Sequence, residues 1–244
     1  MKTRSSLPLL ILSCAASLAL AAPAQRGPNG SCDGTCPGKP ADSAAGVATS
    51  ADTTPLTLSA AARSALLFQI DEERMARELY SAFGAKWDLR PFANIPQAEE
   101  RHESVLRQLA VRAGLTAPTT VAGRFDSAEV QKRYDDLLKL GLESADAALR
   151  VGAYVEEVDI ADLNTLVATT DSEALKAAAH ALKTASGHHL SAFMSVLASR
   201  GITYAPQVLS AEDFKSLTMQ AGGHRGLGQG RGQGRGWRGG TGSN

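Results

Sequence analysis

The sequence predicts an all-α fold: a bundle of four long helices, with one long crossover between the second and third helices and short accessory helices. Three observations support this prediction. From Leu58 onward, apolar residues recur at alternating steps of three and four, the composition is dominated by Ala, Leu, Glu and Arg, and strand signals are nearly absent. Long helices are expected at residues 58–84, 95–113, 144–168 and 172–200, and shorter ones at residues 127–140 and 210–220.

Residues suited to helix ends support these bounds. Short polar side chains accept hydrogen bonds from the free amides of a first turn, and three of them stand where N-caps are expected: Ser59, Ser144 and Asp171. Glycine readily adopts the left-handed backbone that closes many helices, and three glycines stand where C-terminal caps are expected: Gly114, Gly141 and Gly201.

The lengths of the connections indicate how the helices are ordered in space. Short segments join the first helix to the second and the third to the fourth, so each pair is expected to pack antiparallel. About 30 residues, from Leu115 to Glu143, separate the second helix from the third and contain a helix of their own. This pattern favours one long crossover over a simple up-and-down bundle.

Residues 1–24 have the plan of a secretory signal peptide. Lys2 and Arg4 precede an apolar run, and the small residues that follow suit cleavage after Ala21 or Ala24. The run is too short for a membrane-spanning helix. We therefore expect an exported protein, either periplasmic or secreted.

All three cysteines precede the helical region. Cys14 follows Leu and Ser in a context that resembles a lipoprotein processing site, so lipid anchoring through Cys14 is the alternative to a cleaved signal peptide. Residues 25–56 are rich in Gly, Pro, Ala, Ser and Thr, and are expected to form a linker. Within it, Cys32 and Cys36 are expected to form a small disulfide loop, with a metal-binding or redox pair as the alternative.

Charge is unevenly distributed, although the formal net charge of the chain is zero. Residues 52–220 hold 23 acidic and 17 basic side chains, whereas residues 221–244 hold four arginines and no acid. An acidic body argues against a core that binds nucleic acid. We expect a folded domain at residues 57–220, followed by a disordered Gly/Arg-rich tail that contacts anionic envelope polymers or only solvent.

Polar residues occupy the middle of core-facing stripes that are apolar at both ends. The second helix carries Glu99 and His102 there, the third Glu156 and Asp159, and the fourth Ser186 and His189. Burying a carboxylate is costly unless it is paired, protonated or bound to metal. A Glu and a His three residues apart project from adjacent turns of one face and can hold one ion together. We therefore predict that these groups meet at one depth in the bundle and hold metal.

The first helix offers two candidates for the same depth. Glu72 lies on a stripe with Phe68, Met75 and Leu79, and periodicity alone prefers it. Glu73 lies on a neighbouring stripe that is nearly as apolar. The residues by themselves leave this choice open.

These polar positions resemble those of the rubrerythrin and ferritin-like superfamily. The similar segments are Glu73-x-x-Ala76-Arg77-x-x-Tyr80, Ala98-Glu99-x-x-His102 and Glu156-x-x-Asp159. In that superfamily the first-helix Glu is an iron ligand with the Tyr close by, so the resemblance favours Glu73 over Glu72. The third-helix pair has Asp where the superfamily has a second Glu.

Four longer segments resemble an uncharacterised ferritin-like domain family found in exported prokaryotic proteins: DEERMARELY, NIPQAEERH, VGAYVEEVDIADL and GHHLSAF. This similarity covers about residues 58–217. It implies a ferritin-like four-helix bundle and a metal site, and it implies no particular activity.

The fourth helix departs from the superfamily pattern, because Ser186-x-x-His189 stands where Glu-x-x-His is usual. The resemblance still implies four carboxylates and two histidines for two iron ions, with manganese as the alternative metal. The implied ligands are Glu73, Glu99, Glu156, Asp159, His102 and His189. Glu99 and Glu156 would bridge the ions, and Asp159 would partly replace the missing Glu. A single-metal or vestigial site is the alternative.

Three functions fit these expectations. The first is a di-metal oxidoreductase that reacts with oxygen, peroxide or ferrous iron, with an electron donor yet to be identified. The second is a metal-buffering protein of the cell envelope without turnover. The third is a metal-free structural or interaction bundle, in which the polar groups form a hydrogen-bonded network. The sequence assigns no catalytic residue, and it leaves open whether the protein is an enzyme and whether it forms a homodimer.

Overall fold

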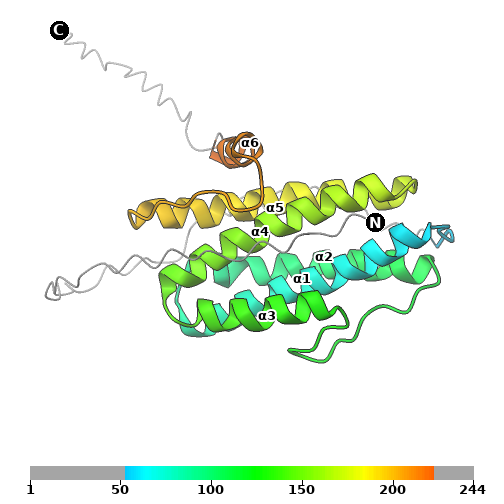
Figure 1. Cartoon of the computed structure of the whole chain (residues 1–244), viewed down its shortest axis with the longest axis horizontal. Coiled ribbons are helices and arrows are strands. Elements are labelled where there is room, and N and C mark those ends of the chain that lie inside the picture. Colours follow the sequence, from blue (N-terminus) through cyan, green and yellow to red (C-terminus); the bar gives the residue numbers. More distant parts are fainter. Residues whose placement is uncertain (1–52, 223–244) are drawn as a thin grey trace, which may run out of the picture. The chain divides into compact units, whose positions relative to one another are not determined.

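The computed structural model describes the backbone of residues 53–222 and the side chains of residues 53–218. The predicted signal peptide, Cys14, the Cys32–Cys36 pair and the tail beyond residue 222 lie outside the described residues. Within them the fold is all-helical, with six helices and no strand (Figure 1). The helices are α1 (Ala60–Lys86), α2 (Arg90–Arg112), α3 (Ala128–Gly141), α4 (Ala145–Thr169), α5 (Glu173–Ser199) and α6 (Ala211–Gly222).

Serine side chains cap the starts of the helices largely as predicted. The Ser59 hydroxyl accepts a hydrogen bond from the Ala62 amide, and Ser144 does the same for α4. The expectation for Asp171 is wrong, because α5 begins one residue later and Ser172 is its N-cap. From there the Ser172 hydroxyl reaches the free amide of Leu175 in the first turn.

Two of the three expected glycine caps are confirmed. Gly114 and Gly201 follow α2 and α5 with φ values of 66° and 71°, in the left-handed region that glycine tolerates. The expectation for Gly141 is wrong, because this residue is the last of α3 and has no positive φ. It lies against the Phe83 ring, where a Cβ atom would be 2.1 Å from Phe83 Cζ. The close approach of that ring is what requires glycine here.

Helix α2 begins at Arg90, five residues before the expected start at residue 95. Pro91 lies in its first turn, where the missing N–H of proline costs no helical hydrogen bond. Pro96 lies inside the helix. It therefore leaves the carbonyl of Phe92, four residues earlier, without its usual helical donor.

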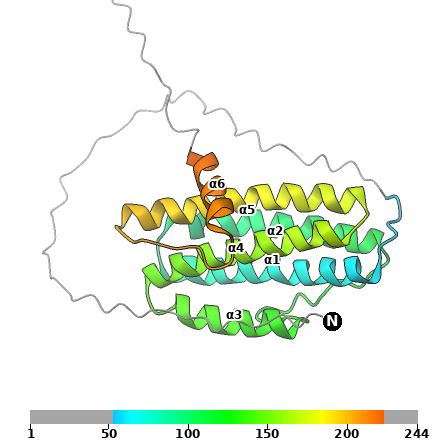
Figure 2. The same cartoon turned by 45° about the horizontal axis from the view of Figure 1, so that its top comes forward.

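The four long helices contact one another in pairs. Packing is most extensive between α1 and α2 and between α4 and α5, and α1 also packs on α4 and α2 on α5. The Leu56 amide donates to the Arg112 carbonyl at 2.9 Å, which places the start of α1 beside the end of α2. The start of α1 also lies beside the end of α4, because the Ser59 hydroxyl is 3.5 Å from the Thr169 carbonyl. Helix α3 packs on α1 and α4, and α6 packs on α5 (Figure 2).

Two apolar clusters lie on either side of a polar middle layer. One cluster is formed by residues such as Tyr80, Phe92, Leu149 and Phe193. The other contains the opposite halves of the same helices, with residues such as Leu66, Leu106, Leu163 and Leu182. The buried polar residues of α2 and α5 and residues 71–74 of α1 fall between the two clusters, and those of α4, at residues 156–159, lie at the edge of the first cluster. None of the described helices is both long and apolar enough to cross a membrane.

Candidate metal centre

Carboxylates and imidazoles from four helices meet in the polar middle layer. Glu73 comes from α1, Glu99 and His102 from α2, Glu156 from α4 and His189 from α5. They form two groups, Glu73 with Glu99 and His102, and Glu99 with Glu156 and His189. Within each group the ligand atoms lie within 4.8 Å of one another. Glu99 belongs to both groups. We call these five residues the cluster.

The two imidazoles approach different oxygens of the shared Glu99 carboxylate. His102 Nδ1 lies 2.8 Å from Glu99 Oε2 and 3.3 Å from Glu73 Oε2. His189 Nδ1 lies 2.9 Å from Glu99 Oε1 and 3.6 Å from Glu156 Oε2. The two rings stack with their centroids 5.6 Å apart. Both histidines therefore direct Nδ1 toward the carboxylates.

The imidazoles balance the charge of the buried carboxylates. Burial lowers the pKa of His102, but Glu73 and Glu99 outweigh burial and raise that pKa to about 11. In the same way Glu156 and Glu99 raise the pKa of His189 to about 10. Burial raises the pKa of Glu99, yet the two imidazoles lower it to about 2. In the absence of metal, both imidazoles are therefore protonated near neutral pH and pair with carboxylates.

Glu73 rather than Glu72 belongs to the cluster, although both are buried. Successive residues of a helix point about 100° apart, so Glu72 faces α3, where Arg133 donates to it. On either side of this pair, Asp71 accepts from the Ser127 amide and Arg74 donates to the carbonyls of the loop before α3. The charged run of α1 is buried because each member has its own partner.

Asp159 lies in the same layer but outside both groups. Its Oδ1 accepts from Gln69 Nε2, and its Oδ2 is 2.5 Å from the Ser186 hydroxyl. That hydroxyl also lies 3.0 Å from the Leu182 carbonyl, and it has only one proton to donate. A protonated Asp159 that donates to Ser186 satisfies all three groups. In agreement, burial and the neighbouring carboxylates, Glu73 first, raise the pKa of Asp159 well above its usual value.

Tyr80 joins the cluster to the aromatic part of the core. Its hydroxyl donates to Glu156 Oε1 at 2.7 Å. Its ring contacts Phe193 and Phe92, with centroid distances of 5.3 and 6.0 Å. The tyrosine therefore lies beside the cluster, but its hydrogen bond is to Glu156 of α4, whereas the resemblance implied a position close to the first-helix Glu73.

Comparison with known proteins identifies the region that carries the cluster. Residues 62–221 match the family described as Uncharacterized protein domain (DUF2202). The chain belongs to this family. All five cluster residues lie within the DUF2202 domain, as do Gln69, Asp159 and Ser186.

The DUF2202 domain is similar in sequence and in fold to one archaeal protein. The Uncharacterized protein MJ0754 of Methanocaldococcus jannaschii is 31% identical over 157 residues, which cover 64% of this chain and 85% of that protein. The crystal structure of hypothetical protein MJ0754 matches 64% of this chain and 91% of that chain, with a TM-score of 0.63.

The donor atoms of the DUF2202 cluster fit a metal ion. Six buried side-chain atoms make no hydrogen bond within the described residues, and three of them belong to the cluster: Glu73 Oε1, Glu99 Oε1 and His189 Nδ1. His189 Nδ1 and Glu99 Oε1 are close but not aligned as a hydrogen bond, as expected for atoms that face a common point. An unpaired buried polar atom costs about 1–3 kcal/mol, which coordination would offset. Mixed carboxylate and imidazole ligands suit iron and manganese.

Two buried polar residues near this layer, Gln69 and Glu157, are not among the residues predicted from the sequence. Gln69 lies one helical turn before Glu73 and donates to Asp159, so it is a polar member of the same stripe. Glu157 follows Glu156 but points away from the cluster. It accepts from the Tyr204 hydroxyl and from three consecutive backbone amides, at residues 207–209. Only the spacing of Gln69 from Glu73 could have been read from the sequence.

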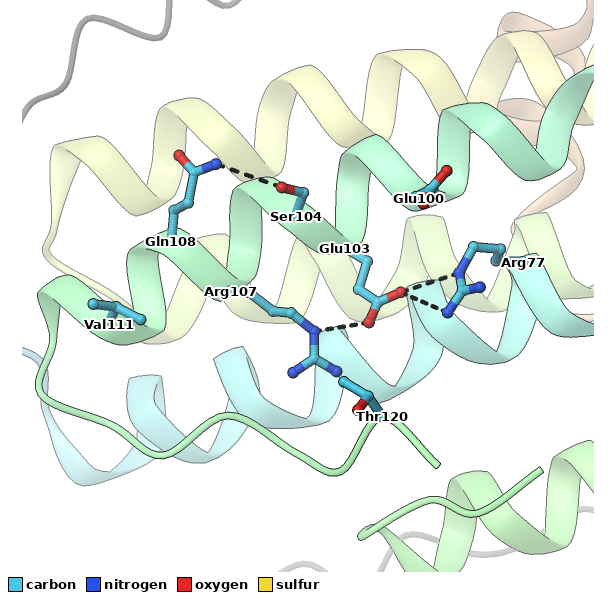
Figure 3. A pocket seen from close by; sticks show the side chains of 8 residues that line it. All are labelled: Arg77, Glu100, Glu103, Ser104, Arg107, Gln108, Val111 and Thr120. Atoms are coloured by element: carbon cyan, nitrogen blue, oxygen red, sulfur yellow. Dashed lines mark hydrogen bonds and ion pairs between the residues drawn. The ribbon is translucent and has the colours of Figure 1, made fainter. Parts of the chain in front are cut away.

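A surface groove of about 410 Å³ lies outside the cluster, between α1, α2 and the loop that follows α2. Figure 3 shows Arg77 and Arg107 pointing toward the same carboxylate, that of Glu103. Arg107 also donates to the carbonyls of Pro118 and Thr119. Because these charged groups satisfy one another, we assign no ligand to the groove.

Proposed function

We propose that this chain is an exported, ferritin-like protein that binds two divalent metal ions, iron or manganese, in its DUF2202 domain. In this proposal α1, α2, α4 and α5 are the four bundle helices, and the segment that contains α3 is the long crossover. The start of α1 lies beside the ends of both α2 and α4, so each of these helices runs antiparallel to α1. Helices α2 and α4 are therefore parallel to each other, which supports a long crossover between them.

The observation that carries the proposal is the shared carboxylate. Glu99 lies in two ligand groups at once, each completed by one further Glu and one His from α1, α2, α4 or α5. Two ions that share Glu99 would each have a carboxylate and an imidazole of their own. Such paired O and N ligands recur in the di-iron and di-manganese proteins built on four helices.

The residues around the cluster have separable roles in this function. Iron or manganese, when bound, supplies the redox chemistry toward oxygen, peroxide or ferrous iron. The apolar clusters on either side exclude water from the layer. Tyr80 holds a proton at Glu156 Oε1, and Asp159 holds one between its own carboxyl group and Ser186. Burial, with neighbouring carboxylates, raises the pKa of Tyr80 and of Asp159, so both groups keep their protons next to the cluster.

A metal-free structural role is the second candidate, and the charge balance favours it. With both imidazoles protonated, two positive charges face the three carboxylates of the cluster. A network of this kind can persist without a cation if its hydrogen bonds are satisfied. The two candidates differ in whether the purified protein contains metal.

Elemental analysis of the mature protein tests the proposal. We expect about two metal equivalents per chain and their loss in the His102→Ala, His189→Ala double variant. The matched control is His188→Ala, which removes an exposed imidazole from the neighbouring position on α5. This control should keep its metal, and circular dichroism should show all three proteins to be helical.

The outcomes separate the two candidates. Metal that is lost from the double variant and kept by His188→Ala supports the di-metal site. An absorption band that forms when ferrous iron is added to the metal-free protein in air would favour a redox role over buffering. Equal metal contents in the wild type and the double variant, including none in either, would overturn the proposal and leave the structural role.

A further inference from the structure

The cluster is enclosed by four lines of contact between neighbouring long helices, which we call seams. Two of the seams are closed on the outside by charged pairs. Helix α3 packs over the seam between α1 and α4, where Arg133 pairs with Glu72. Arg77 of α1 pairs with Glu103 of α2 at 3.1 Å and closes the seam between those two helices.

The seam between α4 and α5 is covered by the chain that follows α5. Glu157 of α4 accepts from the backbone amides of residues 207–209, which holds the loop before α6 on α4. The Ser191 hydroxyl of α5 donates to the Leu217 carbonyl of α6, which holds α6 on α5. The loop and α6 together therefore span this seam.

The seam between α2 and α5 has no such cover in the described part of the chain. Helix α3 contacts α1 and α4, and α6 contacts α5, so neither accessory helix contacts α2. The α6 contacts on α5 are at Gly187 and Ser191, which lie nearly opposite to His189 around that helix. Packing between α2 and α5 is also the least extensive of the four pairs.

The exposure of the cluster agrees with an opening on this side. The imidazoles of His102 on α2 and His189 on α5 are partly exposed, whereas the three carboxylates of the cluster are buried. Behind the two rings, Glu99 Oε1 is buried, makes no hydrogen bond and lies 2.9 Å from His189 Nδ1. An ion that passes the rings therefore reaches an oxygen that is free to bind it.

Small side chains flank the two imidazoles along this seam. Helix α5 runs antiparallel to α2, because α2 and α4 are parallel and a short turn reverses the chain between α4 and α5. Ala98 is therefore level with Ala192 on one side of the imidazole pair, and Val105 is level with Ala185 on the other. All four residues are partly buried. Larger side chains at these positions would fill the space in front of the rings.

We propose that the seam between α2 and α5 is the path by which a divalent cation enters and leaves the cluster. The imidazoles of His102 and His189 stand at its inner end, and the four small side chains leave room for an ion to pass. This inference rests on the function proposed above, because it requires the cluster to bind metal. It adds that side chains that bind no metal set the rate of metal exchange.

The kinetics of Mn²⁺ exchange in the whole mature protein test this path. Loading is followed by the loss of the free Mn²⁺ signal in electron paramagnetic resonance, and release is followed after an excess of chelator is added. Both directions use the same path. A narrower seam should therefore slow loading and release by the same factor and leave the dissociation constant unchanged.

Three variants change the width of the seam. Ala185→Leu and Ala192→Leu narrow it, and each should slow both rates roughly tenfold, because the larger side chain must move aside within a packed interface. Val105→Ala widens the seam and should raise both rates. Ala177→Leu is the matched control, because Ala177 is exposed about three turns from His189 on the same helix. It should exchange metal as the wild type does, and circular dichroism should show all four variants to be helical.

The outcomes separate this inference from the function proposed above. Slower exchange at an unchanged dissociation constant in both leucine variants of the seam, with faster exchange in Val105→Ala, supports the path. Wild-type rates in all three seam variants would overturn the path while the metal site stands. A changed dissociation constant with an unchanged loading rate would do the same. A wild-type protein that binds no Mn²⁺ would overturn both proposals.

Discussion

At the scale of single residues, the charge state of His102 and His189 links the cluster to pH. Both imidazoles have a pKa raised by neighbouring carboxylates, to about 11 and about 10. A raised pKa stabilises the fold fully below the unfolded value of about 6.5, and this stability is lost as pH rises toward the folded value. Bound metal has the opposite dependence on pH, because an imidazole must lose its proton from the nitrogen that coordinates the metal.

We therefore predict opposite pH trends with and without metal. When a chelator keeps the protein free of metal, its free energy of unfolding should fall between pH 7 and pH 9.5. The expected slope is on the order of 2 kcal/mol per pH unit if both imidazoles contribute fully. With manganese present, metal affinity should rise over the same interval. Urea unfolding at several pH values measures the first trend, and calorimetric titration the second.

The control for this prediction is a His102→Gln, His189→Gln variant, in which neither titrating group remains. Its metal-free stability should fall less steeply between pH 7 and pH 9.5, and the slope that remains is expected from Glu73, whose pKa burial raises to about 8. A variant with the same pH slope as the wild type would show that other groups set the dependence.

At the scale of helices, α4 presents adjacent carboxylates to opposite sides. Glu156 faces the cluster, and Glu157 accepts from Tyr204 and from the backbone amides of residues 207–209 in the loop before α6. The loop between α5 and α6 is therefore attached to α4 by the buried Glu157 side chain and, at the surface, by Arg150, which donates to the Thr203 carbonyl. Helix α6 itself rests on α5, where Leu217 approaches Gly187.

We predict that Glu157→Gln releases this loop without unfolding the long helices. The amide N–H₂ of Gln would face backbone N–H donors, so about 1.5–3 kcal/mol should be lost locally, the usual value for a hydrogen bond to a charged group. Hydrogen exchange should accelerate at Gln207, Val208 and Leu209 and through α6. The core of α1 should stay protected, and uniform acceleration along the chain would contradict a local role.

At the scale of the whole molecule, the helices were predictable because periodicity and caps act locally. The polar middle layer was predictable for the same reason, since Glu99, His102, Glu156 and His189 fall on apolar stripes. The choice between Glu72 and Glu73 depended on Arg133 of α3, a partner of Glu72 that lies 61 residues away in sequence. No local pattern contains that pairing.

Other features could not be predicted from the sequence, because they depend on residues that are close only in the folded structure. The position of Gly141 in the sequence predicts a helix cap, whereas the structure shows that glycine is needed there because the Phe83 ring leaves no space for a side chain. Asp159 reads as a ligand from its spacing after Glu156, whereas its hydrogen bonds to Gln69 and Ser186 arise from α1 and α5. The expected start at residue 95 put Pro96 in the first turn of α2, whereas the helix begins at Arg90, has Pro91 in its first turn and contains Pro96 in its interior.

Export is a proposal about the whole molecule and has its own test. If residues 1–24 are a cleaved signal peptide, mass spectrometry of the protein from its native host should give a mature chain that starts at Ala22 or Gln25. A lipid-modified chain that starts at Cys14 would support anchoring instead. A full-length chain with Met1 retained in the cytosol would contradict export.

The stacked histidines have a consequence for selectivity. The side chains of His102 and His189 are each 12% exposed, whereas no carboxylate side chain of the cluster exceeds 3%. A cation arriving from solvent thus meets an imidazole ring before a carboxylate. Copper and zinc bind imidazole more tightly than manganese or ferrous iron do, so they would compete at the entrance. Any preference for iron or manganese must then come from the oxygens deeper inside, or from which metals the compartment supplies.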